Sequence, residues 1–531
     1  MTELQKESSG SIRQILFSSS IVAVIFLLVK FTGFIEKLVL ANYFGTSDAA
    51  DAYLMAFHIP FAFYLIIEEI INPVLVPYFV DKFSRGESEL GIKVFKRFFL
   101  ALSLIFLILS LGVYLNSEWF VSRLAPGFAG EKKLLTIQLL ESMVLVFLFL
   151  GLSSLLTTLF HAHKQFNLPV LARALPKIFI VLGILLLHQK FGIMSAVLGC
   201  LAGTFLKTVL LFIKLPIRVQ KVFSPVSISI PASEMRRLIW LMLPIFFGVL
   251  FSQASGLVDN FVSSKLGTGI IASLTYARKI VDLPVLIVPF SMGIVLLPYF
   301  SLLSSPEKHS EFAHLFDRCF KILLTLFTFI TILVLVFNTE VVQILFERGK
   351  FDASSTKVTA SALAWFSLGL IAFAIEIPVM QSFFALKDTL TPIVIGIVCA
   401  LINMVLTFAF VTEIGFIIVP IALALQKTLK VTILLGLLKR KIPITTMNYA
   451  KFSGKLILNA TFTTLILFQL KEWGPTSHPL NLFLLGTTLI GGTILTFVLF
   501  FIFSKLLRIH EINYFHPKFV VMFVKQKMRS I

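Results

Sequence analysis

Ionisable side chains interrupt the long apolar runs of this chain at spacings that could bind an anion. Lys30, Gly33 and Lys37 lie at positions i, i+3 and i+7 of the first run, so they would share one stripe of a helix. A charge in the middle of a bilayer costs about 2.5–3.5 kcal/mol on insertion scales, so a run that keeps several charges points to a function for them. Ammonium groups on one stripe could hold a phosphate or another anionic group.

The second apolar run and its counterpart later in the chain repeat this feature. Asp51, His58 and Glu69 are separated by 7 and 11 residues, close to whole helical turns, so they also fall on one stripe. The later run contains the basic neighbours Arg278 and Lys279. We therefore predict a charged, water-accessible cavity between membrane helices. The predicted anion-binding residues are Lys30, Lys37, Lys279 and Arg278, and the predicted supporting residues are Gly33, Glu36, Asp51, His58, Glu69, Asp259 and Asp282.

The same charges have a second interpretation, in which they form satisfied pairs that hold helices together. On this interpretation Lys30 pairs with Asp51 or Glu69, and Lys279 pairs with Asp282. Pairing alone does not explain why the charges cluster in the first two runs of each half of the chain, so we predict the cavity.

Sequence signatures of enzymes and of cofactor sites are missing. The chain has no GxxxxGK[ST], HExxH or GxSxG pattern, and Cys200, Cys319 and Cys399 lack the paired spacing of a metal site. We expect no catalytic residue, no bound metal and no cofactor. The energy for any movement would then come from an ion gradient or from the membrane potential.

Composition indicates the class of protein that must position these charges. Hydrophobic residues make up 57% of the chain, charged residues make up 14%, and the mean hydropathy is +0.96. Apolar runs of about 20 residues, each long enough to cross a bilayer, recur between Ile15 and Phe503. Because a chain in lipid must satisfy its own backbone, we predict an all-α polytopic membrane protein with about fourteen transmembrane helices.

The formal net charge of the chain is +19. Such a charge could indicate a nucleic-acid partner, but the basic residues are concentrated in alternate loops, as the positive-inside rule predicts. We therefore expect no nucleic-acid partner, both termini on the cytoplasmic side, and contacts with anionic membrane lipids. The basic and aromatic segment 506–531 is predicted to lie on the inner leaflet as an amphipathic helix.

The chain contains an internal repeat with a nearly constant offset. The matched segments are VLVPYF at 74–79 with VLLPYF at 295–300, VFKRFF at 94–99 with LFDRCF at 315–320, and FHAHKQFNLP at 160–169 with FFALKDTLTP at 383–392. This predicts two homologous six-helix lobes related by a pseudo-twofold axis along the membrane normal, with the substrate site between them. Each Pro-Tyr-Phe sequence should end or kink a helix and place its aromatic rings at headgroup level.

The repeat divides the chain into predicted parts. These are an N-terminal lobe over 1–217, a cytoplasmic linker over 218–235, a C-terminal lobe over 236–438, two further transmembrane helices over 439–505 and the basic tail over 506–531.

Four segments together resemble the MviN/MurJ family of lipid II flippases, in the multidrug/oligosaccharidyl-lipid/polysaccharide exporter superfamily. They are KFTGFIEKLVLANYFGTSDAADAYLMAFHIP at 30–60, SLTYARKIVDLP at 273–284, ILFERGKFDASSTKVTASALAWFSLGL at 344–370 and FFALKDTLTP at 383–392. The resemblance implies a two-lobe transporter of the bacterial cytoplasmic (inner) membrane. It would move the undecaprenyl-pyrophosphate-linked peptidoglycan precursor to the outer leaflet by alternating access, and its last two helices would form a groove for the lipid tail.

The resemblance also implies roles for individual residues. Lys30 and Lys279 stand where the family usually has arginines that face the cavity, and Asp51 matches an acidic residue of the family. We expect Lys30, Lys37 and Lys279 to hold the pyrophosphate. Asp51 and Glu69 would keep these lysines oriented.

The chain departs from the family pattern at two other places. Glu36-Lys37 stands where Arg-Asp is usual, so the signs are reversed, and Tyr64 stands where an arginine is usual. A guanidinium binds a phosphate with two hydrogen bonds, whereas lysine acts as a point charge. The departures therefore concern the substrate contacts more than the class of transporter.

Three other functions fit parts of the sequence. A flippase for another polyprenyl-linked saccharide would have the same architecture. A cation-coupled multidrug exporter would have twelve spans and an acidic cavity. A membrane scaffold that recruits cell-wall synthesis enzymes would tolerate changes to the cavity lysines.

Overall fold

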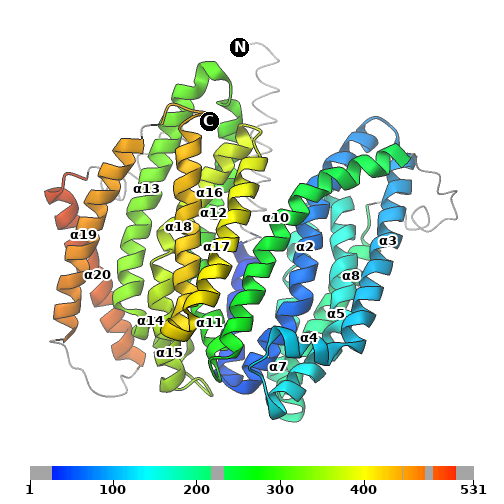
Figure 1. Cartoon of the computed structure of the whole chain (residues 1–531), viewed down its shortest axis with the longest axis horizontal. Coiled ribbons are helices and arrows are strands. Elements are labelled where there is room, and N and C mark those ends of the chain that lie inside the picture. The colour runs from blue at the N-terminus through cyan, green and yellow to red at the C-terminus, as the bar shows by residue number, and fades with distance from the viewer. Residues whose placement is uncertain (1–24, 26, 217–231, 445, 473–481, 510–531) are drawn as a thin grey trace. The chain divides into compact units, whose positions relative to one another are not determined.

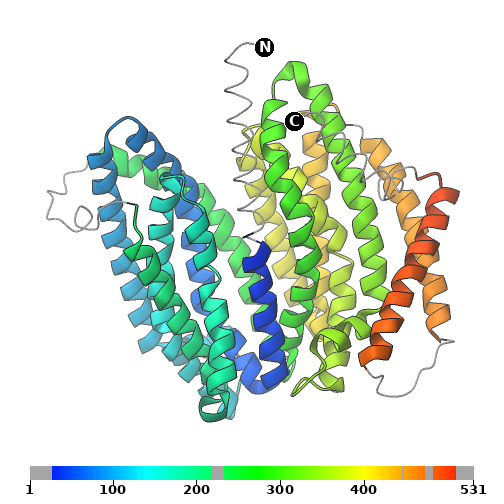
Figure 2. The same ribbon diagram turned by 180° about the vertical axis from the view of Figure 1, so that it is seen from behind.

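The computed structural model describes residue 25 and residues 27–216, 232–444, 446–472 and 482–509, and every regular element in this part of the chain is a helix (Figures 1 and 2). The predicted all-α class is confirmed. Ten helical segments of the described residues are long and apolar enough to cross a membrane, or eleven if the bent pair α15 (Ala353–Ser367) and α16 (Leu370–Ala385) forms one span. Three of the ten segments contain two α-helices each: Asn167–Phe191, Ile270–Leu302 and Leu390–Leu438, the last with a 3₁₀ turn between them. Fourteen spans are consistent with these helices but are not established by them.

The described residues form two compact units. The first unit comprises the described parts of Met1–Tyr276, Arg348–Asp352 and Gly396–Phe416, and the second comprises those of Ala277–Glu347, Ala353–Ile395 and Ile417–Ile531. The lobes predicted from the repeat are halves of the sequence rather than packing units, and they stay a prediction. The predicted linker and basic tail lie mostly outside the described residues.

The helices of the first unit pack around a core formed by α2, α3 and α5. The helices are residues 27–44, α2 (Asp48–Ser84), α3 (Ser88–Leu115), α4 (Ser117–Leu124), α5 (Gly130–Ala162), α6 (Asn167–Ala172), α7 (Leu175–Phe191), α8 (Met194–Ile213) and α10 (Ala232–Ser264), together with the start of α11 (Ile270–Ile287) and most of α17 (Leu390–Ile414).

The second unit has its own core, which α12, α13, α16, α18 and α19 share. Its helices are the rest of α11, α12 (Pro289–Leu302), η1 (Pro306–Lys308), α13 (His309–Val336), α14 (Asn338–Phe346), α15 (Ala353–Ser367), α16 (Leu370–Ala385), α18 (Ile418–Leu438), α19 (Thr446–Glu472) and α20 (Leu482–Leu506).

The internal repeat is visible in both cores. In the first unit Phe79 of α2 and Phe95 of α3 are buried, with ring centroids 6.2 Å apart. In the second unit Phe300 of α12 and Phe316 of α13, each 221 residues later, are also buried, with centroids 6.4 Å apart. The matched segments therefore make the same kind of core contact in each unit.

The two Pro-Tyr-Phe sequences place their phenylalanines in protein cores. Phe79 and Phe300 are fully buried, whereas Tyr299 is 38% exposed. That the rings lie at headgroup level stays a prediction. Neither proline ends its helix, because α2 continues past Pro77 to Ser84 and α12 continues past Pro298 to Leu302. Membrane helices tolerate internal proline where neighbouring groups satisfy the freed backbone.

The third pair of matched segments forms the same turn. Lys164, after α5, and Lys387, after α16, have positive φ angles of 58° and 59°. The next residue in each case donates its N–H to the carbonyl five residues earlier, Gln165 to Phe160 and Asp388 to Phe383, at 2.9 Å in both. Glycine usually takes this left-handed position after a helix, so the shared lysine conformation marks the segments as equivalent.

Helix α2 contains three internal prolines, Pro60, Pro73 and Pro77. Each lacks the N–H that would bond to the carbonyl four residues earlier, so the hydrogen-bond ladder of α2 has three gaps. Next to the middle gap, the Asn72 side chain donates a hydrogen bond to the Glu68 carbonyl at 3.2 Å. A side chain thus takes part in satisfying the backbone near a proline.

Candidate functional site

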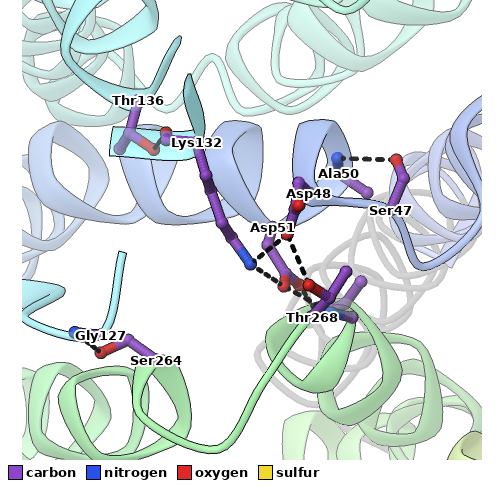
Figure 3. Close-up of polar contacts among 11 residues, drawn as sticks. Ser47, Asp48, Ala50, Asp51, Gly127, Lys132, Thr136, Ser264 and Thr268 are labelled. Atoms are coloured by element: carbon purple, nitrogen blue, oxygen red, sulfur yellow. Dashed lines mark hydrogen bonds and ion pairs between the residues drawn. The ribbon is translucent and has the colours of Figure 1, made fainter. Parts of the chain in front are cut away.

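A fully buried carboxylate, that of Asp51, joins segments of the first unit that are distant in sequence (Figure 3). Asp51 lies in the first turn of α2, after the capping residue Ser47. Its carboxylate accepts hydrogen bonds from the backbone N–H groups of Gly269, at 2.7 Å, and Ala272, at 2.9 Å. An α-helix leaves its first N–H groups without partners, so Asp51 caps the N-terminus of α11.

Lys132, in the first turn of α5, neutralises this carboxylate. Its ammonium lies 2.8 Å from Asp51 and 2.7 Å from Asp48 (Figure 3). Asp48 also accepts a hydrogen bond from the Thr268 hydroxyl at 2.8 Å. The buried charge of Asp51 is therefore both paired and hydrogen-bonded, which is the condition for a buried ion pair to persist.

This geometry corrects the role predicted for Asp51. The predicted partners of Asp51 are cavity lysines, with Lys30 named for a satisfied pair. Across the described ranges, the cation that pairs with Asp51 is Lys132. Lys132 has the sequence context of an ordinary loop charge, and no spacing rule links residues 81 positions apart.

A cation from another helix approaches Gly33 in the helix of residues 27–44. A Cβ built on Gly33 would stand 3.0 Å from the ammonium of Lys177, which reaches over from α7. The same ammonium lies 3.4 Å from the Val29 carbonyl. Lys30 is half-buried and lies three residues before Gly33, on the same stripe of the helix. The predicted site did not include Lys177, because the sequence around Lys177 does not show which other helix its side chain contacts.

Lys37, the third member of the predicted stripe, is paired inside the protein. Its ammonium lies 2.6 Å from Glu36, and the exposed fractions of the two side chains are 8% and 7%. The rings of Tyr53 and Phe57 have their centroids 6.0 and 5.9 Å from this ammonium. In this conformation Lys37 can bind an anion only if Glu36 moves away.

Glu68, and not Glu69, forms the ion pair in the middle of α2. The Glu68 carboxylate lies 2.7 Å from the Arg173 guanidinium, whereas Glu69 is exposed. The stripe predicted through Asp51 and Glu69 assumes a regular helix, but a proline interrupts α2 between them. A rotation of α2 that corresponds to one residue is enough to bring Glu68 to the position predicted for Glu69.

His58 and Asp259 belong to the packing of α2 against α10. A Cβ on Gly256 of α10 would stand 3.4 Å from His58 Nε2. This nitrogen is buried and makes no hydrogen bond within the described part of the chain. Asp259 follows one turn after Gly256 on the same face of α10.

In the second unit Asp282 lies between two cations of α11. Its carboxylate is 3.0 Å from Arg278 and 3.7 Å from Lys279, so the pair named in the second interpretation is present. The Arg278 guanidinium also lies 4.8 Å from the ring centroid of Phe373. The three charged side chains are 31–40% exposed, and an anion could reach them.

A second buried group of charges connects α16 to α18. The Glu376 carboxylate lies 2.7 Å from both Lys427 and Lys430. These lysines are one turn apart on α18, so both can reach a single carboxylate from one face. The group leaves one positive charge in excess inside the second unit.

Comparisons with known proteins agree on one family. The family described as lipid II flippase MurJ matches residues 40–484. A lipid II flippase MurJ of Burkholderia cenocepacia is 24% identical over 458 residues, which cover 84% of this chain and 87% of that protein. A probable lipid II flippase MurJ of Vibrio cholerae is 25% identical over 500 residues, which cover 90% and 94%.

The fold is shared with a solved structure titled lipid II flippase MurJ, inward closed conformation. The TM-score is 0.75 at 23% sequence identity, with 92% of this chain and 98% of that chain covered.

Proposed function

Because the chain belongs to the MurJ family of lipid II flippases, we propose that it moves lipid II, the undecaprenyl-pyrophosphate-linked peptidoglycan precursor, to the outer leaflet by alternating access. The apolar helices and the family make it a multi-pass protein of the inner membrane. We place both termini on the cytoplasmic side because of the distribution of basic residues between loops. Transport is driven by an ion gradient or by the membrane potential.

The Lys177 ammonium at Gly33, on the stripe of the helix that also carries Lys30, supports this proposal. Ammonium groups held near one another in a low-dielectric region favour an anion between them. The pyrophosphate of the substrate is such an anion. Lysine binds the pyrophosphate as a point charge, without the two parallel hydrogen bonds that arginine donates. This weaker binding favours release of the substrate on the other side of the membrane.

In the second unit, Asp282 only partly neutralises Arg278 and Lys279, so these two cations can bind an anionic group of the substrate. Lys37 becomes a further ligand when Glu36 releases it. Asp51 supports the fold of the first unit and does not orient these cations. Membrane lipids surround the helices, and the cell-wall synthesis machinery is the partner that would use the product.

Depletion of the protein tests the proposed function. Cells depleted of this protein should accumulate lipid II in the inner leaflet, and an assay of leaflet accessibility of the precursor should show this loss. Expression of the intact chain should restore access from outside. Unchanged accessibility after depletion would contradict the proposal.

Gly33→Leu should reduce transport while leaving the protein folded. The new side chain would displace the Lys177 ammonium from Gly33. Leucine is a better helix former than glycine by about 0.5–1 kcal/mol, so the helix itself is not weakened. We expect lipid II transport to fall by about tenfold, the effect of losing about 1.4 kcal/mol of binding.

Gly436→Leu is the matched control, because Gly436 of α18 is exposed and has open space where its Cβ would be. The leaflet assay and the amount of protein in the membrane are compared for both variants. Equal transport by the two variants would show that the position of Lys177 over Gly33 does not matter.

A multidrug exporter is the second candidate, because the fold also matches a multidrug resistance MATE family transporter in an inward-facing conformation. The TM-score is 0.68 at 13% identity, with 79% of this chain and 98% of that chain covered. Removal of residues 445–531 separates the two functions. The exporter function should survive this deletion, whereas lipid II transport, which needs the two last helices for the lipid tail, should be lost.

A further inference from the structure

A mostly apolar crevice, which Asn116 also lines, opens in the first unit beside α3 and α4. Its volume is about 460 Å³, within the size range of small-molecule sites. Phe63 of α2 and Phe147 of α5 line it, their rings 5.8 Å apart and steeply inclined at 76°. Phe147 is buried, so the crevice reaches into the packed part of the unit.

Gly112 of α3 keeps part of this space open. No heavy atom lies within 4 Å of the position that a Cβ on Gly112 would take, and its φ angle is ordinary for a helix. A larger side chain at position 112 would therefore enter the crevice without meeting the backbone. Substitution of Gly112 by a larger residue can therefore be used to fill the crevice and block binding there.

The residues around the opening of the crevice have the character of a lipid-facing surface. Helix α3 is one of the membrane-spanning candidates. Four leucines at helical spacing along α3 have exposed fractions of 54–69%, which is typical of a lipid-facing surface. They are Leu104, Leu107, Leu111 and Leu115. Ile108 and Trp119 line the crevice and are themselves 60% and 57% exposed, so they form its rim.

The rim also carries polar groups of the kind found at headgroup level. Trp119 lies on the short helix α4, and tryptophan is enriched at membrane–water interfaces. Arg123 is exposed and follows Trp119 by four residues, so the two side chains lie on one side of α4. An arginine at this level can bind a phosphate with two hydrogen bonds.

Helix α4 is fixed to α5 by two polar contacts. The Ser117 hydroxyl donates to Glu141 at 2.6 Å, and the Lys133 ammonium lies 2.8 Å from Glu118. The hydrogen bond from Lys133 holds the pKa of Glu118 below its usual value. These contacts hold α4 in a defined position, so the rim of the crevice is an ordered part of the first unit.

We propose that this crevice binds one acyl chain of a membrane phospholipid, with the lipid phosphate beside Arg123. An aromatic and aliphatic crevice of this size is unfavourable when filled with water and favourable when filled with hydrocarbon. The surrounding hydrocarbon is phospholipid, and the cation one turn beyond the rim matches its phosphate. The site goes beyond the proposed transport, since it does not involve the cations proposed to bind the pyrophosphate.

Photochemical labelling tests the proposal. The full-length protein is placed in vesicles of phosphatidylethanolamine and phosphatidylglycerol that contain a small fraction of phosphatidylglycerol with a diazirine on one acyl chain. Peptide mapping should find label on Phe63, Ile108 and Phe147. Gly112→Leu should reduce labelling of these residues by about tenfold, equal to about 1.4 kcal/mol of binding, whereas the control Gly436→Leu should leave it unchanged.

Arg123→Gln provides a second test in an exposed position, where the fold does not depend on the side chain. It should reduce crevice labelling by the phosphatidylglycerol probe without changing labelling of Leu104 or Leu107. The proposal is overturned if label reaches only these outward leucines, or if Gly112→Leu and Gly436→Leu are labelled equally in the crevice. It is also overturned if a diazirine analogue of undecaprenyl phosphate labels the crevice and the phospholipid probe does not.

Discussion

Asp51→Asn should lower the free energy of unfolding by about 3–5 kcal/mol, the usual cost of removing one partner of a buried ion pair. The Asp51 side chain is fully buried, and Lys132 is 10% exposed. The amide keeps one acceptor oxygen but places an N–H₂ group either against the Ala272 N–H or against the Gly269 N–H and the Lys132 ammonium, which all need an acceptor. The start of α11 would lose part of its cap. Thermal unfolding of the purified protein in detergent measures the effect.

Asp48→Asn is the control, because Asp48 contacts the same lysine but is 52% exposed. Exposed ion pairs contribute about 0–1 kcal/mol, so this variant should unfold near the wild-type temperature. Asp51→Asn combined with Lys132→Met should recover part of the stability, since the unpaired ammonium is removed. Equal losses for Asp48→Asn and Asp51→Asn would show that Asp51 is not the central group of this junction.

Lys30→Ala and Lys279→Ala should each reduce lipid II transport by about 10–100-fold or more. Loss of a hydrogen bond from a charged group removes about 1.5–3 kcal/mol, and each variant removes one cation proposed to hold the pyrophosphate. The amount of protein in the membrane should not change, because Lys279 is 40% exposed and Lys30 is half-buried. The leaflet-accessibility assay and an immunoblot of the membrane fraction measure the two quantities.

Lys190→Ala is the matched control for these variants, since Lys190 is an exposed lysine at the C-terminal end of α7. It removes the same charge from the chain and should transport lipid II normally. Normal transport by both Lys30→Ala and Lys279→Ala would remove the proposed site. Low protein levels in both variants would instead assign the two lysines to folding.

The sequence predicts the helical class and the repeat well, because both depend on local patterns. Apolar runs set the length and type of each helix. The matched segments are similar enough in sequence to be aligned at one offset, and this alignment pairs the Phe79–Phe95 contact with Phe300–Phe316. The pair Lys279–Asp282 could be predicted for the same reason, since the two residues are one turn apart on one helix.

The contacts between helices could not be predicted in this way. Lys132 finds Asp51 across 81 residues, and the ammonium of Lys177 lies over Gly33 in a different helix. Such contacts depend on the rotation of each helix about its own axis, which one sequence does not fix. In the middle of α2, Glu68 forms an ion pair and Glu69 is exposed, so two neighbouring residues of one helix have different surroundings.

The three prolines of α2 make this helix easier to bend than an uninterrupted one. Its first turn holds the start of α11 through Asp51, whereas its last turns pack Phe79 into the core. With three hydrogen bonds missing between these ends, one end can tilt while the other keeps its packing. A transporter built on such a jointed helix can open towards one face of the membrane without dismantling the contacts that close the opposite face.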